Sequence, residues 1–363
     1  MRFLQNAGLY NTYRPRLARL ASACTSYTEH LEVFLADCYG ACHVLGPVLE
    51  RSADAFFTNG DDEGIQRAWA REHGLSATIS MADILLAQLE EHRAEVFYNL
   101  DPMRFGAEFV ARLPGCVKRT IAWRAAPSAG ADLGAFDLLV CNFPGILRGY
   151  AAQGWRCAYF APALDPTMEQ FSAQQERPVD VVFVGGYTRH HRNRSEVLEA
   201  VAGLADRRTV MFHIDRSRPT VLAESPLGCL LPLGKYRRPK VIQQVHAEPV
   251  FGIDLYAVFS RAKIVLNGAI DMAGEDRGNM RCFEAMGCGA LMVSDAGRYP
   301  AGMADGETML TYDTPAGAAA TIDGILNRPD ELRAIAMRGR RSMEQHYNKR
   351  DQWSSFVELA SAL

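Results

Sequence analysis

The chain has 363 residues, which is more than one hydrophobic core usually organises, so its length predicts two domains. Hydrophobic residues make up 48% of the sequence and charged residues 22%, as in ordinary globular proteins, which argues against a disordered or fibrous chain. The formal net charge of -3 at pH 7 gives no support to a nucleic-acid-binding surface.

The cysteines and the apolar runs indicate the expected location. Nine cysteines are scattered without a C-x-x-C pair, so neither a disulfide framework nor a zinc cluster is predicted, and we expect a reduced, cytoplasmic setting. No apolar run is long enough to span a membrane, and the N-terminus lacks the pattern of a signal peptide. Peripheral association with the inner face of a membrane stays compatible with the sequence, because it requires only a modest basic or apolar patch.

The first half of the chain alternates short apolar runs with segments of helical character. This alternation is typical of parallel βαβ units and predicts a Rossmann-like domain over residues 1–170. The expected strands are 2–5, 96–98, 120–123, 138–141 and 158–160, and the clearest helix is 81–92.

The pattern breaks in the polar segment 165–180, which contains Pro166 and Pro178 and reads as a linker between domains. A second Rossmann-like domain is expected over residues 179–346, and its first strand ends at Gly185-Gly186. Residues 347–363 contain a last helix with an apolar stripe, which we expect to return to the first domain. The other expected strands of the second domain are 209–214, 264–267 and 291–294, and its expected helices are 195–204, 254–261 and 329–346.

The segment 263–295 is the most informative part of the sequence. A strand ending at Asn267-Gly268 is followed by a polar loop and by a short helix that begins near Met280. Such a helix N-terminus presents unpaired N–H groups, and Arg277 and Arg281 would add positive charge, so the segment predicts a site for a phosphorylated ligand. Glu284 could accept hydrogen bonds from a pair of ligand hydroxyls, although an ordinary solvated ion pair with a neighbouring arginine is the alternative.

Together these features resemble the GT-B glycosyltransferases, and the closest likeness is to the retaining, family-4-like branch and its spore-maturation-type relatives. The resemblance is strongest from Val179 onward, and the stretch FEAMGCGALMVSD matches the family pattern closely. Members of that branch have two acidic residues, separated by seven, at this helix. Asp276 and Glu284 stand at that spacing here, with Asp where Glu is usual, so that the neighbouring Glu275 could equally reach the ligand.

The resemblance implies a role for each part of a nucleotide-sugar site. Glu284 would bind the ribose hydroxyls, Asp276 would contact the donor sugar, and a basic residue after the first strand of the domain would meet the diphosphate. For that basic residue Arg189, Arg192 and Arg194 are candidates, and Arg192 is preferred. The implied catalytic residues are Asp276, Glu284 and Arg192, and the implied donor-binding residues are Gly185, Gly186, Arg189, Phe251, Gly252, Asn267, Arg277, Gly278, Asn279, Met280, Arg281 and Glu284.

The first domain would supply the acceptor site, and its sequence is less informative. Related enzymes often have a histidine or an acid near the ends of these strands, whereas the run 120–123 here ends at Trp123-Arg124. His190-His191 lacks a second ligand pair and no D-x-D motif is present, so no metal site is predicted. The residues that follow the strands and could line the acceptor site are Asn6, Gly8, Asn99 and Asp101.

The function expected from the resemblance is metal-independent, retaining transfer of a sugar from a nucleotide-diphosphate sugar. The acceptor would be a glycan, a lipid-linked sugar or a protein, and no cofactor besides the donor is expected. Two alternatives stay open: a nucleotide-sugar epimerase or hydrolase with the same two domains facing across a cleft, and a non-catalytic glycosyltransferase-like binding subunit. A dinucleotide-dependent dehydrogenase is disfavoured, because Gly185-Gly186-Tyr187 does not match G-x-G-x-x-G.

Overall fold

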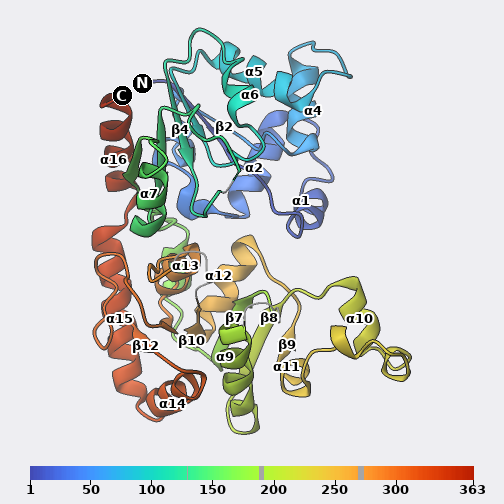
Figure 1. Ribbon diagram of the computed structural model, residues 1–363, viewed down its shortest axis with the longest axis vertical. Coiled ribbons are helices and arrows are strands. Elements are labelled where there is room, and N and C mark those ends of the chain that lie inside the picture. Colours follow the sequence, from blue (N-terminus) through green and yellow to red (C-terminus); the bar gives the residue numbers. More distant parts are fainter. Residues whose placement is uncertain (129, 188–191, 269–273) are drawn as a thin grey trace. The chain divides into compact units, whose positions relative to one another are not determined.

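A computed structural model describes residues 1–128, 130–187, 192–268 and 274–363, apart from the side chains of Arg192 and Cys229. The chain forms two compact units (Figure 1). The first unit comprises Met1–Asp165, Met272–Asp276 and Tyr347–Leu363, and the second comprises Pro166–Asp271 and Arg277–His346. Among the described residues each unit contains one six-stranded parallel sheet with helices around it, which confirms the predicted pair of Rossmann-like domains.

The sheet of the first unit has the strand order β2-β1-β3-β4-β5-β6. Every neighbouring pair is parallel, and the central strands are fully buried, so apolar residues occupy both faces. The order changes direction between β1 and β3, and in open parallel sheets a ligand usually binds beside the strand ends at such a point. The strands are β1 (Phe3–Asn6), β2 (Ala55–Thr58), β3 (Val96–Asn99), β4 (Arg119–Trp123), β5 (Leu138–Cys141) and β6 (Cys157–Tyr159).

The helices of the first unit connect these strands, and several begin at a side-chain cap. Ser26 forms a capping box with Glu29, and Asp62 and Ser80 each accept a hydrogen bond from the first turn of the helix they precede. The helices are α1 (Arg14–Leu20), α2 (Tyr27–Ala36), η1 (Ala41–His43), α3 (Gly46–Leu49), α4 (Glu63–Glu72), α5 (Met81–His92), α6 (Ala107–Val110) and α7 (Pro144–Ala151).

The C-terminal helix α16 (Lys349–Ser361) belongs to the first unit, as the sequence predicted. The ring of Phe356 is fully buried, with its centroid 5.9 Å from that of Phe3 and 5.0 Å from that of Tyr98. At the start of the helix, the Lys349 ammonium group donates hydrogen bonds to the backbone oxygens of Ala41, Cys42 and Val44. Burial lowers the pKa of Lys349 to about 8.

The sheet of the second unit has the order β12-β11-β10-β7-β8-β9, again with parallel neighbours throughout. Numbered within the unit, this is the doubly wound order 3-2-1-4-5-6, and its direction changes between β7 and β10. The strands are β7 (Val179–Gly185), β8 (Val210–Ile214), β9 (His246–Ala247), β10 (Ala262–Leu266), β11 (Leu291–Asp295) and β12 (Leu310–Tyr312).

Helices cover both faces of this second sheet, and one excursion between β8 and β9 extends away from it (Figure 1). The long helix α15 was predicted with the bounds that it has, whereas most other boundaries shifted by one to three residues. The helices are α8 (Met168–Ser172), α9 (Arg192–Ala202), η2 (Gly203–Asp206), α10 (Arg218–Glu224), η3 (Gly228–Leu230), η4 (Gly234–Tyr236), α11 (Lys240–Gln244), α12 (Gly252–Ser260), α13 (Met280–Gly287), α14 (Pro315–Leu326) and α15 (Pro329–His346).

The expected linker at 165–180 differs from the structure. It contains the short helix α8, in which Met168 is fully buried and Phe171 packs edge-on against the ring of Tyr256. The segment is polar overall, but two apolar side chains are sufficient to anchor one helical turn on the second unit. No helix in the described part of the chain has the length and apolar character needed to cross a bilayer.

Candidate functional site

The carboxyl edge of the second sheet gathers most of the residues predicted to bind the donor. Strand β7 ends at Gly185, β10 is followed by Asn267, β11 ends at Asp295 and β12 ends at Tyr312. Because these strands are parallel neighbours, their ends meet at one edge, and the direction change between β7 and β10 lies at its centre. The sequence prediction that this edge forms one site in the second unit therefore has a consistent geometry.

Asn267 connects three strands and a helix at this edge. Its Nδ2 donates to Ser294 Oγ at 3.1 Å, and its Oδ1 accepts from Asn279 Nδ2 at 3.2 Å. Its backbone oxygen accepts a hydrogen bond of 2.8 Å from the Tyr312 hydroxyl. With its side chain engaged in this way and only 5% exposed, Asn267 serves to position the site.

Helix α13 begins beside this amide. Gly278 has φ of 113°, a conformation open to glycine and strained for other residues, and it brings the chain to the N-cap residue Asn279. The Asn279 side chain bonds to Asn267 and makes no cap hydrogen bond to the helix. The first turn of α13, from Met280, thus starts at the centre of the carboxyl edge.

Glu284 lies on α13 and is 3% exposed. Its Oε2 is 2.5 Å from Arg281 Nη1, and the Arg281 guanidinium lies over the ring of Phe259, 5.6 Å from its centroid. Burial raises the pKa of the Glu284 carboxyl, and the nearby Arg281 charge partly opposes that shift. The structure therefore shows a partly buried ion pair, where the sequence left a solvated pair as the alternative.

Arg277 is held by the end of the neighbouring strand. Its Nε lies 2.6 Å from Asp295 Oδ2, and its backbone N–H donates to the oxygen of Arg298 at 2.8 Å. Like Arg281, it is therefore already paired with a carboxylate of the second unit.

Arg194, in the first turn of α9, is the basic residue that the structure places at this edge. Its guanidinium lies over the ring of Phe183, 5.1 Å from the centroid. It is also close enough to Tyr312, Arg281 and Asp295 for their charges to affect its pKa. Burial lowers its pKa, and its Nε is shielded from solvent without a hydrogen-bond partner among the described residues. A half-buried cation with an unused, shielded donor is suited to an anionic ligand.

Gly185 provides the space that Arg194 occupies. A Cβ added at Gly185 would lie 2.6 Å from Arg194 Nη2 and 2.9 Å from Phe183 Cζ, so a side chain there would displace the guanidinium. The prediction placed Gly185 among the donor-binding residues because it ends the first strand. The contact with Arg194 gives this glycine a physical role.

The remaining donor-site predictions fall in three groups. Phe251 is the N-cap residue of α12, and Gly252, with φ of 60°, begins that helix. Gly186 follows β7 and is exposed. Arg189 and the side chain of the preferred residue Arg192 lie outside the described residues, as does His190-His191.

Two arginines that the sequence did not single out fix the other end of α13. Arg177 donates to the backbone oxygen of Cys288 at 2.8 Å and to those of Phe259 and Ala262, and Arg340 donates to that of Gly287. Cations at a helix C-terminus satisfy its open carbonyl groups and complement its dipole. No local motif identifies such residues, because they come from distant parts of the chain.

Asp276 belongs to the first unit, apart from Glu284 in the second. Its carboxylate is 1% exposed and accepts a hydrogen bond from the backbone N–H of Gly145, at the start of α7. Carboxylates commonly occupy such helix N-termini, because they pair with the open N–H groups there. The neighbouring Glu275, the alternative ligand in the prediction, is exposed.

In the first unit, a hydrogen-bond network joins the strand ends where the sheet changes direction. Asn6 Nδ2 donates to Asn99 Oδ1 at 2.9 Å, and Asn6 Oδ1 accepts from the N–H of Gly60 at 2.8 Å. The carboxylate of Asp101 lies so close to Gly8 that an added Cβ would be 2.7 Å from its Oδ2. The structure thus brings together the four residues named for the acceptor side, and Asn6 and Asn99 are buried parts of the framework.

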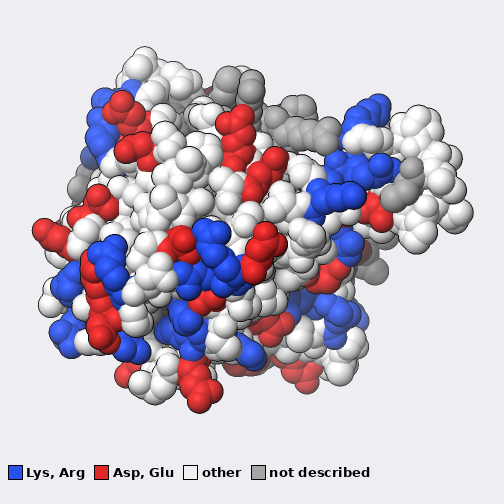
Figure 2. All heavy atoms as spheres, turned by 90° about the horizontal axis from the view of Figure 1, so that it is seen from below, with Lys and Arg blue, Asp and Glu red and all other residues white. Residues whose placement is uncertain are grey.

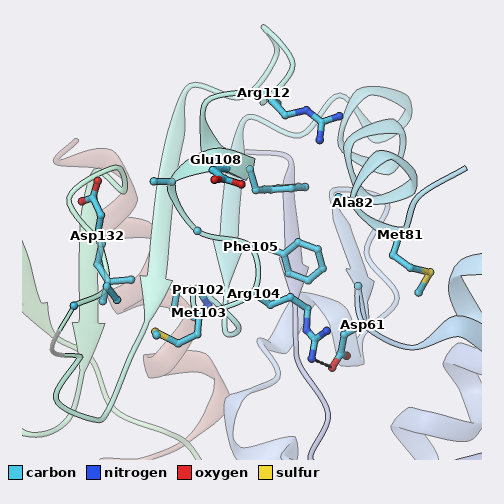
Figure 3. A pocket seen from close by; sticks show the side chains of 17 residues that line it. Asp61, Met81, Ala82, Pro102, Met103, Arg104, Phe105, Glu108, Arg112 and Asp132 are labelled. Carbon is cyan, nitrogen blue, oxygen red and sulfur yellow. Dashed lines mark ion pairs between the residues drawn. The ribbon is translucent and has the colours of Figure 1, made fainter.

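Beside this network the first unit contains a cavity of about 740 Å³ (Figure 3). Asp61 and Arg104 form an ion pair on one side of Phe105, and Asp132 lies on the far side of the cavity from them. The Asp61 side chain is 1% exposed and paired with Arg14 and Arg104, yet its Oδ1 has no hydrogen-bond partner in the described part of the chain. The lining combines carboxylates, guanidinium groups and apolar side chains such as Met103.

His43 lies next to the end of β4, where the sequence shows Trp123 in place of the family's histidine. The two ring centroids are 4.4 Å apart, and His43 Nδ1 is shielded from solvent without a hydrogen-bond partner among the described residues. Burial and, to a lesser extent, the positive charge of Lys349 lower the pKa of His43 to about 3. No local sequence signal identifies this histidine, because it comes from η1, far from β4 in the chain.

The buried imidazole predicts a pH dependence of stability. The unfolded chain binds a proton at His43 near pH 6.5, whereas the folded chain keeps it neutral down to about pH 3, so stability falls as the pH drops below 6.5. At pH 5 this amounts to about 1–2 kcal/mol. Urea unfolding of wild type and His43→Gln at pH 8 gives the structural cost of the substitution. At pH 5 the free energy of unfolding of the variant, relative to wild type, should be higher by about 1–2 kcal/mol than at pH 8. A difference between the two proteins that is the same at both pH values contradicts the assignment.

Residues 194–358 match a family described as glycosyl transferase-like. No curated protein sequence is significantly similar to the chain.

Several solved structures share its fold. HepE from Anabaena, in complex with UDP and glucose, superimposes with a TM-score of 0.61 at 14% sequence identity over 100% of both chains. Sucrose-phosphate synthase from Thermosynechococcus elongatus gives a TM-score of 0.56 at 13% identity over 99% of this chain and 98% of its own. A glycosyltransferase from Rickettsia africae gives 0.53 at 9% identity over the same shares. The chain has the fold of the GT-B glycosyltransferases, and its residues 194–358 are similar to a glycosyl transferase-like family.

Proposed function

We propose that this protein is a glycosyltransferase that binds a nucleoside diphosphate sugar at the carboxyl edge of its second sheet. The observation that carries the proposal is the half-buried guanidinium of Arg194, whose Nε is shielded from solvent and lacks a partner among the described residues at the point where the sheet changes direction. The match of residues 194–358 to a glycosyl transferase-like family supports the same activity. HepE, which has the same fold, was crystallised with UDP and with UDP-glucose.

In this proposal the second unit stabilises the diphosphate leaving group. Breaking the bond between the sugar and the phosphate increases negative charge on the diphosphate, so fixed positive groups lower the barrier. Arg194 supplies one such group, and the N-terminal turn of α13, next to Arg281, supplies backbone N–H groups and a partial positive charge. Transfer then requires no metal ion, since the protein itself provides the compensating charge.

In this proposal the Glu284 carboxylate binds the ribose hydroxyls of the donor. A carboxylate can accept a hydrogen bond from each of two neighbouring hydroxyls, and burial strengthens both bonds. Arg281 pairs with Oε2 and favours the charged form of the carboxyl, against the effect of burial.

The acceptor side of the proposal is the cavity of the first unit. Its mixture of carboxylates, guanidinium groups and apolar surface suits a glycan, whose sugar rings have polar edges and apolar faces. The finer assignment that we propose is retaining transfer in the family-4-like, spore-maturation-type branch, on the strength of the FEAMGCGALMVSD stretch. Asp276 and Arg192 remain proposed catalytic residues.

A nucleotide-sugar hydrolase or epimerase of the same fold is the competing function. Incubation of the protein with radiolabelled UDP-sugars, with and without a panel of saccharides, separates the two. Transfer requires that label appears in a saccharide product. Free or epimerised sugar that forms equally fast without a saccharide contradicts the proposal.

Removing the Arg194 charge should weaken diphosphate binding. Arg194→Met keeps an unbranched apolar stem against Phe183 but loses the guanidinium, so the Kd for UDP should rise about tenfold to a hundredfold. Calorimetry measures the Kd, and Arg333→Met, at an exposed position of the same unit, is the matched control. Equal Kd values for Arg194→Met and wild type would refute the diphosphate site.

The Glu284 assignment is tested by changing the protein and the ligand together. Wild type should bind UDP about tenfold more tightly than 2′-deoxy-UDP, because the carboxylate loses a charged hydrogen bond with the deoxy ligand. Glu284→Gln should bind both ligands weakly and with nearly equal Kd, since that interaction is already lost. A variant that still discriminates the two ligands as wild type does contradicts ribose binding by Glu284.

The acceptor assignment predicts a separate kinetic effect. With a saccharide acceptor identified from the panel, Arg104→Ala should raise the acceptor KM several-fold and leave the Kd for UDP unchanged, because Arg104 lines the cavity of the first unit. Arg19→Ala, at an exposed position of that unit outside the cavity lining, is the control. An unchanged acceptor KM would place the acceptor elsewhere.

A further inference from the structure

The excursion between β8 and β9, residues 216–240, exposes an unusual amount of apolar surface. We call it the leucine excursion. Leu227 is 75% exposed and Leu230 is 85% exposed. Six of the eleven large hydrophobic side chains exposed in the described part of the chain lie in this segment: Val221, Leu222, Leu227, Leu230, Leu231 and Tyr236. Scattered single apolar residues are normal on a protein surface, but such a concentration marks a contact surface.

The leucine excursion is folded, so its exposed leucines do not result from a lack of structure. Arg237 donates hydrogen bonds of 3.0 Å to the backbone oxygens of Ala223 and Gly228. Gly228 packs so closely on the end of α10 that an added Cβ would overlap the oxygen of Leu222. These contacts fix the turns that follow α10 in one arrangement.

The leucine excursion buries an ion pair and exposes leucines, whereas an ordinary domain buries its leucines and exposes most of its charges. The ion pair between Arg238 and Glu224 lies inside, with side chains 6% and 8% exposed and two hydrogen bonds of 2.7 and 2.8 Å. Burying both charges costs desolvation, and exposing the leucines forgoes the hydrophobic stabilisation of burying them. The arrangement becomes favourable when the outer surface of the excursion meets an apolar environment.

The charge of the leucine excursion identifies that environment. Residues 216–240 contain six basic residues and one acid, and this acid, Glu224, is the one buried with Arg238. Arg218, Lys235 and Lys240, in the same segment as the leucines, are exposed. Figure 2 shows the protruding part of the second unit as a mostly white lobe with Lys and Arg atoms at its base. Exposed leucines and exposed cations in one segment match the acyl chains and the anionic headgroups of a lipid surface.

A second copy of the chain fits the leucine excursion less well. A two-fold contact would place the same basic residues of both copies next to one another, and the repulsion would oppose association. Protein interfaces are also rich in aromatic side chains, whereas these exposed residues are mainly leucine. We therefore infer that the leucine excursion docks the protein on an anionic membrane surface, with Leu227 and Leu230 inserted among the lipids.

Sedimentation with vesicles tests the inference on the full chain. Wild type should bind vesicles of equimolar phosphatidylcholine and phosphatidylglycerol, bind phosphatidylcholine alone much more weakly, and dissociate as salt rises. Leu227→Ser with Leu230→Ser should lower the partition coefficient by roughly tenfold or more. Lys235→Gln with Lys240→Gln should lower it about fivefold for each charge removed. Leu20→Ser with Met337→Ser removes two exposed apolar side chains elsewhere and should bind as wild type does.

Three outcomes would overturn the inference. Wild type that fails to bind anionic vesicles at low salt is one, and equal loss of binding in the leucine variant and its control is another. The third is an oligomer in light scattering that the leucine variant dissociates while vesicle binding is unaffected, since this would assign the surface to a second copy. The leucine, lysine and control variants change exposed side chains, and unchanged thermal unfolding confirms that they are folded. Arg194→Met should bind vesicles normally, which separates this inference from the donor site.

Discussion

The arrangement of the second unit depends on one buried amide, that of Asn267. Its hydrogen bonds join the end of β10 to Ser294 on β11 and to Asn279 at the start of α13, and its backbone oxygen takes the Tyr312 hydroxyl of β12. Parallel strands bring their ends to one edge, but they do not fix the distances between the loops that follow. The Asn267 amide fixes these distances at the start of α13, and the ion pair between Arg281 and Glu284 on that helix is positioned with it. Arg177 and Arg340 fix the opposite end of the same helix.

The general architecture was accessible from the sequence because it depends on patterns within short windows. Buried parallel strands appear as continuous apolar runs, and four of those in the second unit were found within one or two residues of their bounds. Strands β2, β9 and β12 were missed. Each is short and at most partly buried, so none makes a run that stands out from the turns around it. The helical periodicity of α15 is long enough to be read directly.

The site was accessible only in part, because its decisive features depend on contacts between distant residues. The sequence indicated α13, Glu284 and a basic loop after β7. It could not show which arginine in that loop is shielded from solvent in the folded protein. Arg194 is distinguished from its neighbours by the space that Gly185 leaves and by the ring of Phe183. His43 reaches Trp123 from a turn that precedes β2, and no local signal connects the two. The leucine excursion shows the same limit, since sequence alone does not tell an exposed leucine from a core leucine.

The hydrogen bond between Asp276 and the N–H of Gly145 has an evolutionary consequence. A Cβ at Gly145 would come within 2.8 Å of the Asp276 carboxylate, so the shorter acid and the smallest residue are matched in size. A glutamate at 276, usual in the family that the sequence resembles, would extend the carboxylate by one methylene into a filled space. The two positions are therefore expected to be epistatic: a change at one becomes tolerable only after compensation at the other. Lineages that carry this protein should have exchanged the two residues together.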